Sequence, residues 1–256
     1  MSSQAFAQGK LKGAKEGLNS PKSSSRSTSS SVDDGPDEVS SSDWFLGKLV
    51  MYATYGAVIG IYGLENHLHN SLSAYPYQST SSGNYSDLQY VPEARDFRLD
   101  LKNHFLAGDR VYGNHLQLRL RPTRYFYIQG DYTELIEPKI GEDDVDNLSI
   151  VNVTACYDRV RLENFNLGWL LGVRYIGSGV DQAGLVYGLQ MEYFTPSNIS
   201  IYTSLRSGYI FERGVNEIEI SARYHLSRLM LSAGYERVQL SSAGFDFVGV
   251  GMGIYL

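Results

Sequence analysis

From Asp96 to Leu256 apolar residues recur at every second position, in runs that turn residues separate. Val250, Met252 and Ile254 form one face of the last run, and ten such runs can be distinguished. A two-residue period indicates β-strands, and the 20 tyrosines and only 7 prolines of the chain suit strands as well. We therefore predict an all-β fold: an antiparallel, up-and-down β-barrel of about ten strands.

The second face of these runs distinguishes a soluble barrel from a membrane barrel, because the two differ in where the apolar face points. In the last run the second face carries Gly249, Gly251 and Gly253, and in the fifth it carries Gly168 and Gly172. Such small groups fill a narrow lumen better than they cover an exterior. The apolar face is therefore expected to meet lipid, as in a transmembrane barrel of the outer membrane.

Charged residues of both signs share this inner face and balance one another. The expected ion-pair residues are Arg98, Arg119, Arg174, Glu192, Arg206, Glu217, Glu219, Arg223 and Glu236, with Lys102, Arg121, Asp100, Asp131 and Asp158 on the same face. Buried ions must be paired to offset several kcal/mol of desolvation each. The pattern predicts a lumen closed by ion pairs and argues against a wide porin.

Connection lengths alternate along the predicted barrel. Short connections fall at 121–124, 195–198 and 226–228, and longer ones at 134–147 and 177–184. Outer-membrane barrels have short periplasmic turns and longer outer loops. With ten strands, both ends of the barrel are expected on the periplasmic side.

The last strand, ending at Leu256, resembles the end of small bacterial outer-membrane β-barrel proteins of uncharacterised type. Their usual final residue is phenylalanine, which the barrel-insertion machinery reads, so leucine departs from the pattern. Tyr75-Pro76-Tyr77 and Gly83-Asn84-Tyr85 also resemble the approach to the barrel in such sequences. The resemblance implies outer-membrane lipid and the insertion machinery as partners, and it implies no activity.

Ahead of the barrel the chain has two different segments. Residues 1–43 are rich in serine and charge, and we expect them to form a disordered tether. Ala5-Phe6-Ala7 has the form of a signal-peptidase site, without an apolar segment before it. Residues 44–95 combine an apolar segment with a polar loop that leads into the barrel.

The apolar segment, residues 44–64, has Lys48 as its only charge and is long enough to span a bilayer as a helix. Four glycines, three tyrosines and an alternating pattern equally fit a strand. Helix and strand both stay open. We favour a short helix packed at the barrel mouth, since the later strands already form an even number.

One histidine and one serine suggest catalysis. His225 and Ser227 would share a strand face, and Glu236 could orient the histidine. The pair is similar to the His-x-Ser of outer-membrane lipid A deacylases, which would imply a lipid-modifying hydrolase. It falls, however, at a predicted periplasmic turn, and Glu236 follows sooner than in that family. We therefore favour a non-enzymatic chain.

Metal-binding signals are weak. Glu142, Asp143, Asp144 and Asp146 could supply calcium ligands, but their spacing does not match an EF-hand, so a solvated loop is expected. The remaining histidines lack cysteine partners and are expected at the surface: His67, His69, His104 and His115. No cofactor is predicted.

The overall charge of -6 is mild and the basic residues are scattered, which argues against nucleic-acid binding. The leading hypothesis is an integral outer-membrane barrel with a structural, surface-attachment or anchoring role. Two alternatives stay open: the lipid A hydrolase, and a soluble calycin-like barrel that binds an apolar ligand inside. The soluble barrel would require the two strand faces to be exchanged.

Overall fold

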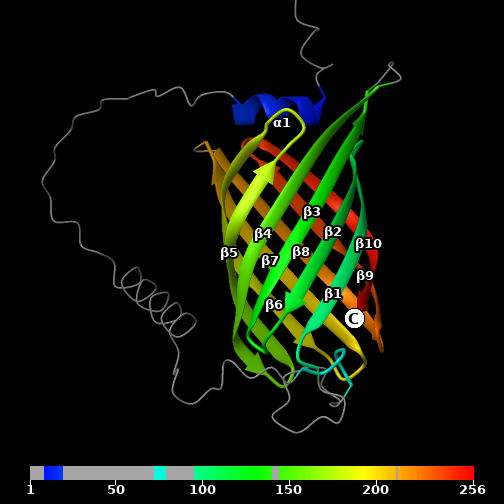
Figure 1. Cartoon of the computed structure of the whole chain (residues 1–256). Helices are drawn as coiled ribbons and strands as arrows, with labels where there is room; N and C mark the ends of the chain where they lie inside the picture. The colour runs from blue at the N-terminus through cyan, green and yellow to red at the C-terminus, as the bar shows by residue number, and fades with distance from the viewer. Residues whose placement is uncertain (1–8, 20–71, 79–94, 140–143, 212) are drawn as a thin grey trace, which may run out of the picture. The chain divides into compact units, whose positions relative to one another are not determined.

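Ten antiparallel strands close into one barrel (Figure 1) in a computed structural model that describes residues 9–19, 72–78, 95–139, 144–211 and 213–256. Each strand pairs with its neighbours in the sequence, and β1 pairs with β10 to close the cylinder. The strands are β1 Arg98–Gly108, β2 Tyr112–Arg121, β3 Phe126–Pro138, β4 Val145–Leu162, β5 Phe165–Ile176, β6 Gln182–Phe194, β7 Ile199–Ile210, β8 Arg213–Leu226, β9 Leu229–Leu240 and β10 Ala243–Tyr255. The predicted fold class is confirmed.

Side chains alternate between the outside and the inside of the wall. On β10, Val248, Val250 and Met252 are 59–67% exposed, whereas Arg98 and Arg174 on the inside are at most 1% exposed. An apolar exterior around a polar interior is the arrangement of a transmembrane barrel. The chain is therefore an integral β-barrel of the outer membrane. The soluble calycin-like alternative is wrong, because it requires an apolar lumen and a polar exterior.

The small residues of the inner face make room for larger ones, as Gly251 on β10 illustrates. Gly251 pairs with His104 of β1, and a Cβ atom at position 251 would overlap the His104 ring. Glycine at this position therefore leaves room for the imidazole.

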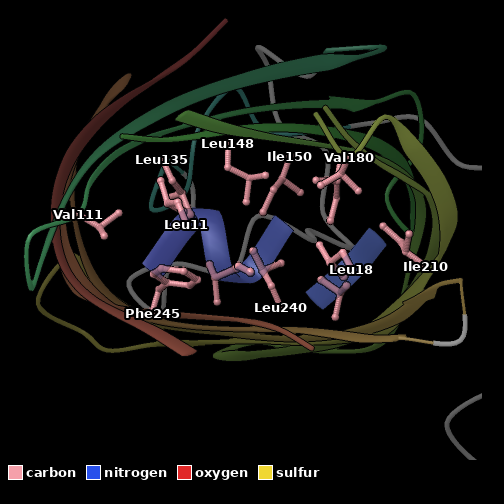
Figure 2. Close-up of a cluster of buried hydrophobic side chains, with 14 of the residues drawn as sticks. Leu11, Leu18, Val111, Leu135, Leu148, Ile150, Val180, Ile210, Leu240 and Phe245 are labelled. Carbon is pink, nitrogen blue, oxygen red and sulfur yellow. The ribbon is translucent and has the colours of Figure 1, made fainter. Parts of the chain in front are cut away.

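One helix, α1 (Lys10–Asn19), lies inside the segment that we expected to be disordered. Leu11, Ala14 and Leu18 are 0–1% exposed and join an apolar cluster at one mouth of the barrel (Figure 2). Their i, i+3, i+7 spacing forms one helix face, so the helix is stabilised by docking. No described helix has both the length and the apolar character needed to cross a membrane.

The remainder of 1–43 and the whole of 44–64 lie outside the described residues, as does the Gly83-Asn84-Tyr85 motif. The described part of the approach to the barrel, residues 72–78, contacts the mouth opposite to α1. Leu72 forms an antiparallel bridge with Arg95, and the Tyr77 hydroxyl lies 2.8 Å from the carbonyl oxygens of Thr195 and Ile199.

The expected long loops are shorter than predicted. Much of 134–147 belongs to β3 and β4, because the two strands stay paired as far as Pro138 and Val145. Leu135 and Leu148 face each other in this extension and enter the apolar cluster. The connection shrinks to 139–144.

Candidate functional site: a closed lumen

Four ion pairs cross the middle of the lumen between strands that are not neighbours in the wall. Lys102 Nζ of β1 lies 2.7 Å from Glu219 of β8, and Arg206 of β7 lies 3.2 Å from Asp131 of β3. Two further pairs join β5 to β8 and β2 to β9, namely Arg174 with Glu217 at 3.0 Å and His115 with Glu236 at 2.5 Å. Each pair therefore joins separate parts of the wall across the lumen.

A second polar group lies towards the mouth where β1 begins. Arg121 lies 2.9 Å from Asp158, Arg98 lies 2.6 Å from Asp100, and Arg223 lies 3.3 Å from Glu192. A tyrosine ring lies against each of these three guanidinium groups, with the Arg98 group 5.2 Å from the centre of the Tyr255 ring. The Arg223 group lies 3.6 Å from the centre of the Tyr202 ring, and the Arg121 group lies 3.8 Å from that of Tyr127. Such contacts favour a desolvated cation.

Arg119 occupies the same region with a different partner. Its guanidinium donates to Gln129 Oε1 at 3.0–3.1 Å and lies over the Tyr127 and Tyr202 rings. The nine residues that we predicted as ion-pair candidates thus all face the lumen. Arg119 is held there by the Gln129 amide and by the Tyr127 and Tyr202 rings.

Little space is left inside. A cavity of about 20 Å³ is lined by residues that include His115, Arg206 and Glu217. Another of about 20 Å³ is lined by residues that include Arg98 and Arg223. A volume of this size holds about one water molecule. Within the described residues, these cavities are too small to pass a hydrated solute.

Above the ion pairs, towards the β3–β4 connection, the lumen becomes apolar, and α1 lies across it (Figure 2). Glu137 at the end of β3 accepts hydrogen bonds from the backbone N–H groups of Lys10 (3.1 Å) and Leu11 (2.8 Å). A carboxylate at this position satisfies two free donors and complements the helix dipole. Lys15 pairs with Asp146 at 2.6 Å, which fixes the second turn of the helix.

The candidate catalytic residues do not meet. His225 is buried, and its ring nitrogens lie 2.9 Å from Ser200 Oγ and from the Tyr255 hydroxyl. Ser227 is exposed in the β8–β9 turn with a φ of 51°. Glu236 contacts His115 instead. The serine and the glutamate are therefore not positioned around the histidine in this structure.

Two histidines that we expected at the surface are buried instead. His104 and His115 are 2% and 4% exposed and lie on paired positions of β1 and β2, both facing inward. The expectation was wrong because both residues occupy lumen positions in the alternation, a signal that the sequence did carry. His67 and His69 lie outside the described residues.

His104, Glu219 and Glu236 come close enough to hold a metal ion, with ligand atoms within 4.8 Å of one another. Two of these groups already have charged partners, since Lys102 binds Glu219 and His115 binds Glu236. An entering cation would have to displace both. The arrangement therefore functions as a charge network.

The acidic loop residues bind side chains of the chain itself. Asp144 pairs with Lys139 and accepts from the backbone N–H of Val145 at 2.9 Å, so the pKa of its carboxyl is lowered, mainly by the hydrogen bond from Lys139. Asp146 pairs with Lys15 of α1. Asp143 lies outside the described residues.

Comparisons with known proteins were made for family, sequence and structure. No protein-family model matches the chain, and no curated protein matches its sequence. The N-terminal β-barrel domain of OprF from Pseudomonas aeruginosa is similar in structure, at 11% identity and a TM-score of 0.32, over 62% of this chain and 97% of that one.

Two other solved structures are similar. Ail, the attachment invasion locus protein of Yersinia pestis, shares 15% identity with a TM-score of 0.30, over 62% of this chain and 96% of Ail. The outer membrane protease OmpT from Escherichia coli shares 8% identity with a TM-score of 0.34, over 67% of this chain and 99% of OmpT. The membrane assignment rests on the barrel's own apolar exterior and polar lumen, independently of these similarities.

Proposed function

We propose that this chain is a closed, non-enzymatic barrel of the outer membrane that serves as a structural, attachment or anchoring element. The observation that carries the proposal is the set of four ion pairs across the lumen, beside cavities that hold about one water molecule each. A transport barrel needs a continuous aqueous path, and the paired side chains occupy the place where that path would run.

Two different layers support closure. The ion pairs fill the middle of the lumen, and α1 with the apolar cluster fills one mouth. Removal of α1 alone is therefore expected to leave the barrel closed. Conduction should require loss of the ion-paired layer.

Conductance in a planar lipid bilayer tests the proposal. The intact protein, and a truncation that lacks residues 1–19, should both give no single-channel steps. A variant with Lys102, Arg206 and Glu219 all replaced by alanine should conduct, because three bulky side chains are removed from the ion pairs that cross the lumen. Met252→Leu on the lipid face is the matched control and should behave like the intact protein. Steady conductance by the intact protein would overturn the proposal.

The lipid A hydrolase is the alternative from another functional class. Ser227, the predicted nucleophile, is not among the partners of His225 described above, since the ring binds Ser200 and Tyr255. Replacing Ser227 by alanine and following the acyl chains of lipid A separates the two functions. A changed acyl pattern would support the enzyme.

A further inference from the structure

The position of α1 has a consequence for the way the chain is distributed across the membrane. The barrel groups that bond to Lys10, Leu11, Lys15 and Asn19 of α1 lie at one mouth: Asp109 after β1, Glu137 and Asp146 around the β3–β4 connection, and Gly179 after β5. These connections all follow odd-numbered strands, so they share one end of the barrel. The helix is attached to three connections at this end.

Residues 72–78 are attached to the other end. The barrel begins there at Arg98 and ends there at Tyr255. Tyr77 contacts Thr195 and Ile199 in the β6–β7 turn, and its ring lies 5.4 Å from that of His225. This turn follows an even-numbered strand, so it belongs to the mouth opposite to α1 (Figure 1).

The apolar wall lies between these two mouths. In a membrane, lipid surrounds that wall, and one mouth faces each aqueous side. A helix bonded to one mouth and a segment bonded to the other therefore lie on opposite sides of the bilayer.

We propose that α1 is displayed at the cell surface, on the side of the outer membrane opposite to residues 72–78 and to both ends of the barrel. The inference goes beyond the closed-barrel function but rests on the same membrane-spanning wall. The side is assigned from the connection lengths that the strand bounds give: 139–144 and 177–181, both at the α1 mouth, are longer than the other connections, and longer connections are typical of the outer face.

The contacts of α1 with the barrel stabilise the helix. A helix of this length is marginal in water by itself, so it needs the burial of Leu11 and Leu18 and the carboxylate of Glu137. Its outward face remains polar, with Lys12 and Glu16 exposed to solvent. This face is the part of α1 that the proposal places outside the cell.

The amino-acid sequence between the two attached segments is compatible with a crossing. It includes 44–64, which has one charge and the length that a membrane-spanning helix requires. The structure of this part lies outside the described residues.

Cysteine labelling in intact Gram-negative cells tests the arrangement. Cys156, the only cysteine of the chain, is 0% exposed, so the unmodified protein is the unlabelled control. Lys12→Cys reports on α1, Asp109→Cys on the α1 mouth, and Arg228→Cys on the opposite mouth; all three positions are exposed. A membrane-impermeant maleimide should label Lys12→Cys and Asp109→Cys in intact cells. It should label Arg228→Cys only after the outer membrane is permeabilised.

The outcomes separate the proposal from the barrel itself. Heat-modifiable gel migration first shows that each variant has folded. Labelling of Lys12→Cys together with Arg228→Cys, while Asp109→Cys labels from the other side, overturns the placement of α1 and leaves the barrel intact. A complete reversal of the three results overturns the cell-surface assignment. If Asp109→Cys and Arg228→Cys label from the same side, the barrel does not span the membrane and the proposed function fails as well.

Discussion

Lys102 and Glu219 show how a single contact supports the closed lumen. Both side chains are at least nine-tenths buried, and Glu219 lies between Lys102 and Arg223, which approaches to 3.7 Å. The cost of removing such charges from water offsets much of their attraction. The pair therefore adds little to the free energy of unfolding compared with apolar residues of the same size. The structure is much more sensitive to losing one partner than to losing both.

Glu219→Leu is therefore expected to destabilise the barrel by about 3–5 kcal/mol, because the Lys102 ammonium is left buried without its closest carboxylate. The double variant Lys102→Met with Glu219→Leu should recover most of that loss. Urea unfolding in detergent micelles measures both. Lys139→Ala, which breaks an exposed pair with Asp144, is the control and should change stability by less than about 1 kcal/mol. Equal effects of the single and the double variant would contradict this interpretation.

Tyr77 connects 72–78 to the barrel through its hydroxyl, which lies 2.8 Å from the carbonyl oxygens of Thr195 and Ile199. Burial, followed by the charge of Glu192, raises the pKa of its hydroxyl from 10.0 to about 12. The folded protein favours the neutral form, so the contribution of Tyr77 is complete below pH 10 and is lost as the pH rises towards 12. We expect proteolysis of the segment to accelerate over this range in the intact protein. Tyr77→Phe should cleave faster already at neutral pH and should lose the alkaline step. A step that persists in the variant would assign it to another group.

At the scale of elements, α1 is the part that the sequence did not reveal. Its three apolar residues are too few to stand out among lysines, glycines and serines, and the helix is completed only by the apolar mouth. That mouth is formed by residues far along the chain, such as Leu148, Ile210 and Phe247. A local pattern cannot show a partner of this kind, so the segment was expected to be disordered.

Two substitutions on α1 should change the rate of its cleavage by trypsin in opposite directions. Leu11→Asp introduces a charge at a position that is 0% exposed, so the helix should undock and trypsin should cleave after Lys12 and Lys15 at a higher rate. Gly13→Ala should slow this cleavage: an added Cβ meets nothing within 4 Å, and alanine favours a helix by about 1 kcal/mol over glycine. Heat-modifiable migration should stay unchanged in both. Equal cleavage rates for the two variants would argue against docking as the source of the helix.

The strands were much easier to predict, because a period of two is a local property and every strand repeats it. The same parity identified the inward charges. It could not identify their partners, since Lys102 meets Glu219 only after the wall has curved around the lumen. The loops were predicted too long because turn residues and charges continue into the ends of β3 and β4.

For the whole molecule, the two strand faces determine where the protein resides, and the lumen determines what can pass. The location of the protein in the membrane follows from the alternation of apolar and polar residues along the strands, so it could be predicted from the sequence. Closure depends on contacts across the barrel, so the sequence could only indicate it through balanced charge. The fold alone does not determine the biological role, because one fold can host many functions.

The seam between β1 and β10 also constrains how the protein can be made. Asp100 of β1 pairs with Tyr255 of β10. The backbone groups along this edge of β1 therefore have no hydrogen-bonding partner until β10 is in place. Until then any growing or partly assembled sheet has two open edges, which are prone to pair with other chains. Contacts so distant in sequence also form slowly. A chain in which β1 cannot yet pair with β10 is therefore prone to aggregate, and a truncation in β10 should convert a stable barrel into an aggregation-prone sheet.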